Sequence, residues 1–97
     1  MTIKLLNIDD EKRARIFKAL SEKKRIEIVR YLMERPQANS CGEIGRTLGM
    51  DKSNVTYHLK IMNDAELIHV VREGQNKKIH LVKDMFNAAV PGFLDSL

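Results

Sequence analysis

The segment that follows Gly49 carries polar side chains at a spacing that would let them act together. A helix that begins near Asp51 would be apolar on one side, at about 100° of rotation per residue. That apolar side consists of Val55, Leu59 and Met62. The opposite side carries side chains that form hydrogen bonds, namely Ser53, Thr56, Tyr57, Lys60 and Asp64. Such a face can bind DNA bases and phosphates, although a solvated surface is the commoner explanation for an isolated amphipathic helix.

The first turn of this helix is the part best suited to read DNA. Short side chains there let the helix N-terminus approach base edges in the major groove, where the helix dipole also favours a nearby phosphate. Asn54 can form two hydrogen bonds with adenine, and Lys52 can reach guanine or a phosphate. Lys60 lies further along the helix and is at best a phosphate contact. We therefore predict a set of DNA contacts on this helix, consisting of Lys52, Ser53, Asn54, Thr56, Tyr57 and Lys60.

A second group of candidate side chains is basic. Arg72, Lys77 and Lys78 flank Gly74-Gln75, and three cations so close together repel one another. A phosphate backbone or an AT-rich minor groove would relieve that repulsion, and ordinary solvation is the alternative. We predict DNA contacts at all three. The run Lys23-Lys24-Arg25 lies where a helix begins, a place at which the dipole disfavours cations. Either a phosphate contact or a solvated face accounts for it.

Catalytic chemistry has no candidate residues in this sequence. There is no carboxylate pair, no nucleophile with a neighbouring base and no phosphate-binding loop, so we predict no catalytic residue. Cys41 is the single cysteine and recurs with Ile44 and Leu48 on one helix face. We interpret it as a small buried hydrophobe, with a redox-active thiol as the alternative.

Hydrophobic periodicity predicts the first two elements that hold these side chains. A helix over residues 9–20 has acids in its first turn, which suits the helix dipole. A second helix, from about Glu22 to Glu34, follows Ser21 as its N-cap and ends before Pro36. The expected apolar stripes are Ile16, Phe17 and Leu20 in the first helix and Ile26, Val29, Leu32 and Met33 in the second.

Residues 41–65 have the pattern of a helix-turn-helix. The stretch from Ser40 to Glu43 matches a capping box, and the short helix after it ends at Gly49, a natural left-handed residue. Asp51 then caps the polar helix, which runs to about Ala65. Two helices joined by so short a turn, the second with a bare polar side, form this motif.

Residues 68–82 alternate between apolar and polar side chains, which is the period of a β-hairpin. A two-residue turn at Gly74-Gln75 connects the strands. The apolar pattern selects a register in which two pairs face the core, Ile68 with Leu81 and Val70 with Ile79. After the hairpin, residues 84–97 begin as a helix that Pro91-Gly92 must kink or stop.

The three histidines have different expected roles. The hairpin register sets His69 opposite His80 on the outer face, where they could form half a metal site or a pH-sensitive DNA contact. Because no third ligand lies nearby, we predict no metal site. His58 falls near the edge of the apolar side of its helix, and we interpret it as a hydrogen-bonded structural residue.

Length and composition limit the protein to one small domain, residues 1–97. Hydrophobic residues make up 43% of the 97 residues and charged residues 31%, which is the composition of a globular chain. The net charge of +4 permits nucleic-acid binding without establishing it. No apolar run is long enough for a membrane span or signal peptide, so we expect a cytoplasmic protein without a membrane partner.

The order of these elements and four short motifs resemble the ArsR/SmtB family of bacterial and archaeal transcriptional repressors. The motifs are Phe17-Lys18-Ala19-Leu20-Ser21 with Arg25-Ile26-Glu27-Ile28-Val29, then Glu43-Ile44-Gly45-Arg46-Thr47-Leu48-Gly49-Met50, then Ser53-Asn54-Val55-Thr56-Tyr57-His58-Leu59-Lys60, and Arg72-Glu73-Gly74. The resemblance implies a winged helix-turn-helix fold, mainly α with a small β-hairpin. It also implies a homodimer built from the first and last helices, with one recognition helix and one wing per subunit on operator DNA.

Several positions depart from the family pattern. Metal-sensing members carry thiolates around the first turn of the helix before the recognition helix, and the matching residues here are Ser40 and Gly42. Another family site uses Asp, His and Glu on the terminal helix, and residues 84–97 contain no His and no Glu. We therefore expect neither a metal nor another cofactor, and no typical metal sensor. Glu66 stands where the family often has Gly, so the sequence leaves the end of the recognition helix open, and a left-handed Glu can form there at a modest cost in free energy.

Taken together, these features predict a sequence-specific regulator that binds double-stranded DNA. We expect a homodimeric repressor on an inverted-repeat operator, associated with a prokaryotic nucleoid. Residues 41–65 would be the helix-turn-helix and residues 68–82 the wing; residues 1–20 and 84–97 would form the dimer. The expected interface residues are Ile16, Phe17, Met85, Phe86 and Val90. The alternatives are a winged helix that docks a partner protein and a regulator that responds through the Cys41 thiol. No residue pattern identifies an effector.

Overall fold

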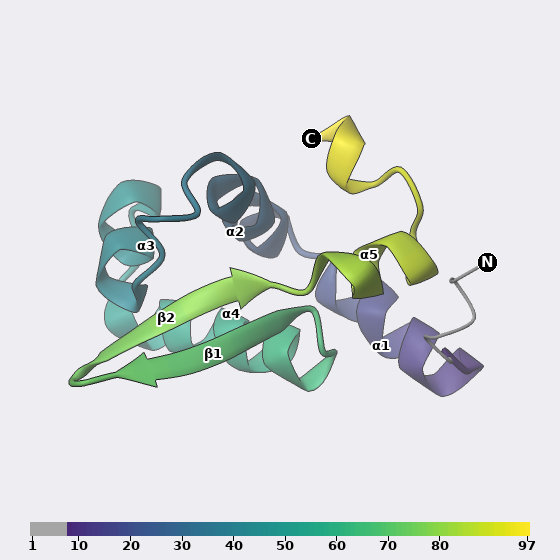
Figure 1. Ribbon diagram of the computed structural model, residues 1–97, viewed down its shortest axis with the longest axis horizontal. Coiled ribbons are helices and arrows are strands. Elements are labelled where there is room, and N and C mark those ends of the chain that lie inside the picture. The colour runs from purple at the N-terminus through teal and green to yellow at the C-terminus, as the bar shows by residue number, and fades with distance from the viewer. Residues whose placement is uncertain (1–7) are drawn as a thin grey trace.

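The computed structural model describes residues 8–97, in which helices surround one face of a two-stranded antiparallel hairpin (Figure 1). The elements in chain order are α1 (Asp10–Ala19), α2 (Lys23–Glu34), α3 (Cys41–Leu48), α4 (Lys52–Asp64), β1 (Ile68–Glu73), β2 (Asn76–Leu81), α5 (Lys83–Ala89) and the 3-10 turn η2 (Leu94–Ser96). This is the mainly α fold with a small hairpin that the sequence predicts. Helix α3 and the hairpin tip lie at one end of the molecule, and α1 and α5 lie at the other.

Helices α1 and α2 begin in different ways. Asp9 caps α1, since its Oδ1 atom accepts a hydrogen bond from the backbone nitrogen of Lys12 at 2.8 Å. The prediction that Ser21 caps α2 is wrong. The N-cap is Glu22, which makes no side-chain capping bond, and the Ser21 hydroxyl instead donates to the carbonyl of Lys18 at 2.7 Å. Ser21 therefore closes the end of α1, and α2 starts one residue later than expected.

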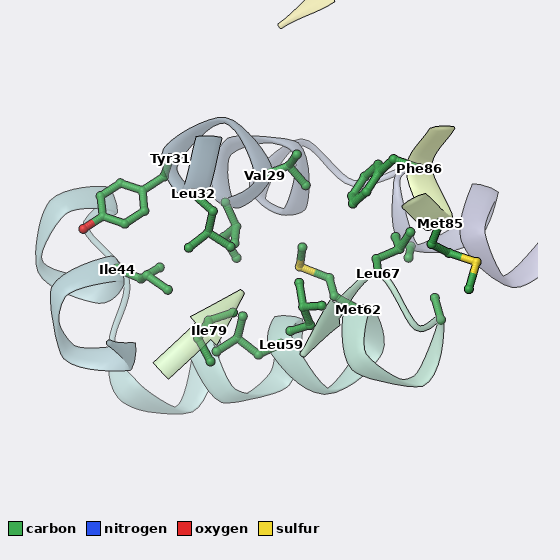
Figure 2. Close-up of a cluster of buried hydrophobic side chains, with 14 of the residues drawn as sticks. Val29, Tyr31, Leu32, Ile44, Leu59, Met62, Leu67, Ile79, Met85 and Phe86 are labelled. Carbon is green, nitrogen blue, oxygen red and sulfur yellow. The ribbon is translucent and has the colours of Figure 1, made fainter. Parts of the chain in front are cut away.

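The core forms where the apolar sides of the helices meet the hairpin. Figure 2 shows side chains of α2, α3, α4, β2 and α5 converging on this space. Its fully buried large side chains are Ile16, Ile28, Val29, Ile44, Val55, Met62, Leu67, Ile79 and Phe86. Burial of these side chains is the main source of stability, at roughly 25 cal/mol per Å² of apolar surface removed from water. The predicted inward face of α4 is confirmed, because Val55, Leu59 and Met62 are all buried.

The inward faces of α1 and α2 are rotated relative to the predicted stripes. In α2 the buried apolar residues are Ile28, Val29, Tyr31 and Leu32, whereas Ile26 and Met33 are only half-buried. In α1 the side chains that face the core are Ile16 and Ala19. Phe17, which was expected in the apolar stripe, is 53% exposed. Helical periodicity predicted the positions of α1 and α2 correctly. The observed buried side of each helix, however, is centred about one residue away from the predicted apolar stripe.

The hairpin has the predicted register. Ile68 pairs with Leu81 and His69 with His80, and a turn at residues 74–75 joins the strands. The apolar face is less complete than expected, however, because Val70 is 39% exposed. The core ends below Ile79, so the outer half of the hairpin extends beyond the helices.

The free edge of β2 is joined to the loop before α3. Ile79 donates its backbone N–H to the carbonyl of Asn39 at 3.0 Å, and the Asn39 side chain donates back to the carbonyl of Ile79 at 2.8 Å. Ser40 and Lys78 form an isolated antiparallel bridge at the same place. These contacts fix the base of the hairpin against the start of α3.

Two further expectations concern chain reversals. Glu66 adopts a positive φ of 62°, the left-handed conformation that the sequence allows at the end of α4. Helix α5 ends at Ala89, and Pro91-Gly92 separates it from η2, as expected.

Within the described part of the chain, no helix combines the length and apolar character needed to cross a membrane.

Candidate nucleic-acid interface

The start of α3 is held by a reciprocal capping box. The Ser40 hydroxyl accepts from the backbone nitrogen of Glu43 at 3.2 Å, and Oε1 of Glu43 accepts from the Ser40 backbone nitrogen at 3.2 Å and from its hydroxyl at 2.9 Å. These bonds from Ser40, the hydroxyl first, lower the pKa of Glu43, and the nearby charges of Lys78 and Arg46 act in the same direction. The predicted capping box is confirmed, and it fixes the angle at which α3 leaves the hairpin.

The turn between α3 and α4 depends on two glycines. Gly49 ends α3 with a φ of 68°, a conformation that costs little only for glycine. Gly45 lies against the turn and the first turn of α4, because a Cβ atom there would lie 2.8 Å from the carbonyl oxygen of Met50 and 3.2 Å from Cγ2 of Val55. A larger residue at position 45 would push α4 away from α3. The turn therefore sets a single crossing geometry for the two helices.

Asp51 is the N-cap of α4, and its Oδ1 atom accepts a hydrogen bond from the backbone nitrogen of Asn54 at 2.8 Å. This cap satisfies one of the free N–H groups of the first turn. The Asn54 side chain is exposed and is not needed for the cap, since only its backbone takes part. The N-terminal turn of α4 is thus held by its cap and exposed to solvent.

The residues predicted to contact DNA from α4 share one exposed side of the helix. All six are exposed, namely Lys52, Ser53, Asn54, Thr56, Tyr57 and Lys60. Lys60 differs from the others because its Nζ atom lies 3.3 Å from Oδ2 of Asp64. A surface ion pair of this kind is weak and does not prevent a phosphate contact. Arg46, which was not singled out from the sequence, lines one pocket together with Lys52 and adds a cation beside this face.

The three basic residues of the hairpin are not equivalent. Arg72 and Lys77 are exposed cross-strand partners next to the turn. Lys78 is half-buried, and because side chains alternate along a strand it points to the opposite face of the hairpin. Its backbone pairs with Ser40, and its charge acts on Glu43. Arg72 and Lys77 therefore form the exposed basic tip, and Lys78 lies beside α3.

Arg25 has a place that neither sequence interpretation foresaw. It is only 5% exposed, so the expectation of a solvated or phosphate-binding residue in the run 23–25 is corrected for this position. Its Nε atom donates to the carbonyl of Ala19 at 2.7 Å, and its Nη1 atom lies 3.0 Å from Nδ1 of His58. Arg25 lies three, four and seven residues before Ile28, Val29 and Leu32, so it shares their helix face. This spacing is the sequence signal that could have predicted its burial. The prediction of a hydrogen-bonded structural His58 is confirmed.

The residues expected at a dimer interface also divide into two groups. Ile16, Met85 and Phe86 are buried within the single chain, which leaves them almost no surface for a second subunit. Phe17 is exposed, and Val90 is half-buried. Of the two segments expected to form the dimer, residues 1–7 lie outside the described residues.

Cys41 and the histidine pair have ordinary surroundings. Cys41 packs against the core as expected of a small hydrophobe, but it is half-buried rather than buried. It lines a pocket of about 290 Å³ between α3 and the start of α4. His69 and His80 are exposed on the outer face of the hairpin, as the register predicts. Across residues 8–97, no group of three or more His, Cys, Asp or Glu side chains could hold a metal ion.

Comparison with protein families identifies residues 8–71 as a helix-turn-helix domain. The chain is 38% identical over 89 residues to an uncharacterized HTH-type transcriptional regulator, YceK, of Bacillus subtilis (strain 168). The match covers 92% of this chain and 89% of that protein. Sequence similarity therefore extends over both the helix-turn-helix and nearly all of the rest of the chain.

Solved structures share the whole fold at lower identity. An ArsR family transcriptional regulator has a TM-score of 0.74 and 20% identity, with 94% of this chain and 91% of that chain covered. HlyU from Vibrio cholerae N16961 has a TM-score of 0.71 and 19% identity, covering 95% and 100%. The homodimeric winged helix-turn-helix DNA-binding domain of a possible ArsR-family regulator from Mycobacterium bovis has a TM-score of 0.70 and 20% identity, covering 89% and 80%. These likenesses show that the fold is a winged helix-turn-helix.

Proposed function

The chain belongs to the helix-turn-helix domain family as a transcriptional regulator, and on this premise we propose that it is a homodimeric repressor of an inverted-repeat operator. The observation that carries the proposal is the bare polar side of α4, which no other part of the described chain covers. Helix α3 packs against α4 through the side of α3 that carries Gly45. The opposite side of α4 is therefore free to enter a groove of DNA. The major groove of B-DNA admits one α-helix in this way.

We assign recognition of the DNA sequence to the first two turns of α4. Lys52, Ser53 and Asn54 stand in the first turn, where the helix dipole favours an approach to phosphate. Asn54 offers its amide to adenine, and Lys52 reaches guanine or a phosphate. Thr56 and Tyr57 continue the same face by one turn, and Lys60 supplies a phosphate contact. This order of contacts matches a recognition helix that enters the groove by its N-terminal end.

The wing, defined as β1, β2 and their turn, is assigned a backbone role. Arg72 and Lys77 project beyond the core, where they can reach phosphates or the minor groove beside the site that α4 reads. Lys78 stands nearer to α3 and would contact the backbone between the two elements. Phosphate contacts add affinity and fix the register of the protein, but they do not select sequence.

The homodimer is assigned to the end of the molecule opposite α3. Helices α1 and α5 both lie there (Figure 1). Phe17 is the large apolar side chain of α1 that remains exposed, and Val90 follows α5 with part of its surface free. The Mycobacterium bovis domain, which has the same fold, is homodimeric. A twofold axis at this end would hold two recognition helices about 34 Å apart, the spacing of successive major grooves.

The decisive experiment is selection of bound fragments from a random duplex library, followed by mobility-shift titration of the selected duplex. We expect Lys52→Ala and Tyr57→Ala each to weaken binding to this duplex by about tenfold or more, because each base-edge contact contributes about 1–3 kcal/mol. The matched control is Lys83→Ala, which removes the same charge from an exposed position at the start of α5. Sedimentation gives the mass of the free and bound protein.

The outcomes separate the parts of the proposal. An inverted repeat in the selected duplex and a dimeric mass support the homodimer, whereas a single half-site bound by a monomer contradicts it. Equal losses from Lys52→Ala and Lys83→Ala would show that α4 does not read sequence. A promoter that carries the selected duplex should be less active when the protein is present, and increased transcription would exclude a repressor.

A further inference from the structure

On the inner side of α4, behind its exposed polar residues, an arginine and a histidine side chain are buried in contact with each other. Arg25 in α2 and His58 in α4 are 5% and 8% exposed, and Nη1 of Arg25 lies 3.0 Å from Nδ1 of His58. The Nε atom of the same guanidinium donates to the carbonyl of Ala19, the last residue of α1, at 2.7 Å. One side chain therefore joins the end of α1 to α2 and to the middle of α4.

This geometry requires one protonation state of His58. A guanidinium stays charged at all ordinary pH values and has only donors, so Nδ1 of His58 must be the acceptor. The ring is then neutral, with its proton on Nε2. A proton added at Nδ1 would remove the acceptor and set an imidazolium against the guanidinium. Within the described residues, no fully buried side-chain nitrogen or oxygen lacks a hydrogen-bond partner, which agrees with the neutral arrangement at Nδ1.

The surroundings of His58 favour the neutral ring. Burial is the largest cause that lowers the pKa of His58 from its ordinary value of 6.5, followed by the positive charge of Arg25 and a smaller effect of Lys24. Glu22 opposes them and raises the pKa. All three charged groups belong to α2 or its N-cap, and the described parts of α1, α3 and β1 add no charged group to this set. The nearest contribution of α1 is the carbonyl of Ala19, which Arg25 already occupies.

The pair is connected to the exposed side of α4 through Tyr57. The rings of Tyr57 and His58 meet edge to face, with their centroids 5.1 Å apart. Tyr57 is exposed and is one of the assigned DNA contacts, whereas His58 faces the interior. The His58 ring therefore contacts both Arg25 of α2 and the aromatic side chain that is assigned to DNA.

We propose that Arg25 and His58 are positioning residues for the recognition helix, and that specific DNA binding requires neutral His58. The inference rests on the proposed function, because it concerns how α4 is presented to DNA. Mild acid breaks the bond between the two side chains, and α4 loses the contact that sets its rotation against α2. Binding to a preferred sequence then weakens more than binding to any other sequence.

The sign of the pH effect follows from linkage. A pKa of His58 that is lower in the folded than in the unfolded state means that the folded state binds fewer protons. The stabilisation is therefore fully present above about pH 6.5 and is lost as the pH falls below that value toward the folded-state pKa. One titrating group can change an equilibrium by at most about tenfold per pH unit.

The test measures the affinity for the selected duplex divided by the affinity for a scrambled duplex of the same length, at pH 7.5 and pH 5.5. The ratio cancels the general attraction to phosphate that any added proton causes. For the unaltered protein we expect the ratio to fall between these pH values by less than about tenfold, because the pKa of His58 in the folded protein lies below 6.5. His58→Asn places an amide oxygen near the position of Nδ1 and does not titrate. We expect it to keep the ratio at pH 7.5 within about threefold and to abolish the pH dependence.

Two further variants separate positioning from general effects. The double variant His69→Gln/His80→Gln removes the other two histidines, which are exposed on the hairpin, and the pH dependence should persist in it. His58→Leu removes the acceptor but keeps an apolar side chain, and we expect it to lower the ratio about tenfold already at pH 7.5. Circular dichroism at both pH values checks folding, and because His58→Asn retains the acceptor, the test does not depend on His58→Leu folding.

A ratio that stays constant in the unaltered protein overturns the inference. So does a pH dependence that survives in His58→Asn or disappears in the double variant. A protein that selects no duplex from the library overturns the proposed function, and this inference with it. A protein that selects a duplex but shows no role for His58 overturns the inference alone.

Discussion

The recognition helix and the wing are both expected to meet DNA, yet the protein holds them very differently. Helix α4 presents one side to solvent and buries Val55, Leu59 and Met62 on the other, with Asp51 capping its first turn. The wing is anchored at its base, through the buried side chains of Ile68 and Ile79 and the bonds between Ile79 and Asn39, and Val70 nearer the tip is 39% exposed. One element packs one whole side against the core, and the outer half of the other projects from it.

This difference explains how α4 and the wing can have different roles in DNA binding. Reading base edges requires donors and acceptors at fixed positions, so it suits a helix whose orientation is determined by packing. Phosphate contacts tolerate movement, so they suit Arg72 and Lys77 at the end of a short hairpin. Specificity should therefore depend on the anchoring of α4, and affinity should depend on the charges of the wing.

The largest contrast should appear in folding stability. Met62→Ala removes a fully buried side chain from the inner side of α4, and we expect it to lower the free energy of unfolding by about 2–5 kcal/mol. Val70→Ala in the wing removes a side chain that is 39% exposed, with an expected loss below about 1 kcal/mol. Chemical denaturation of the two variants measures both values. Equal losses would mean that the wing is as firmly anchored as the helix.

A smaller effect is expected from the wing charges. Arg72→Ala/Lys77→Ala should weaken binding to the selected and the scrambled duplex by the same factor, because we propose that both cations contact phosphate. The slope of log affinity against log salt concentration should become about 2 less steep, or about 1 for each lost contact. Titrations at several salt concentrations measure this slope. Weaker binding to the selected duplex alone would show that the wing reads sequence.

The smallest effect concerns the cap of α4. Asp51→Ala should destabilise the protein by about 1 kcal/mol, because it leaves an N–H group of the first turn without its acceptor. Asp9→Ala is the matched control, since Asp9 caps α1 through an equivalent bond to Lys12. Thermal unfolding should show similar losses in both. Only Asp51→Ala should lower the ratio of specific to scrambled binding, and an equal ratio in both variants would remove the first turn of α4 from the contact set.

Local signals in the sequence were sufficient for the elements and for most of their ends, although the predicted cap of α2 at Ser21 was wrong. The capping box at Ser40, the left-handed Gly49, the cap at Asp51 and the hairpin register all follow from interactions within a few residues, and the structure confirms them. The exposed side of α4 was predictable for the same reason, because helical spacing separates it from the buried side. Motifs in the correct order were also enough to indicate the winged helix-turn-helix.

Other features depended on which elements pack together. Phe17 was expected in an apolar stripe and is exposed, because the core reaches α1 through Ile16 and Ala19. Lys78 shares the hairpin tip in sequence but lies beside α3 in space, because the free edge of β2 pairs with Ser40. Arg25 stands in a run of cations that suggests solvent, and it is buried. In each case the outcome was decided by a neighbour that is distant in the chain.

By itself, therefore, the sequence determined the order of the helices, most of their ends, the exposed side of α4 and the pairing of the hairpin. The physical reason is that caps, turns and periodicity act over a few residues. Only the tertiary structure decided which charges remain in water and which are buried. Arg25 can be buried because the carbonyl of Ala19 and the ring of His58, from two other parts of the chain, arrive at the same point to accept its hydrogen bonds.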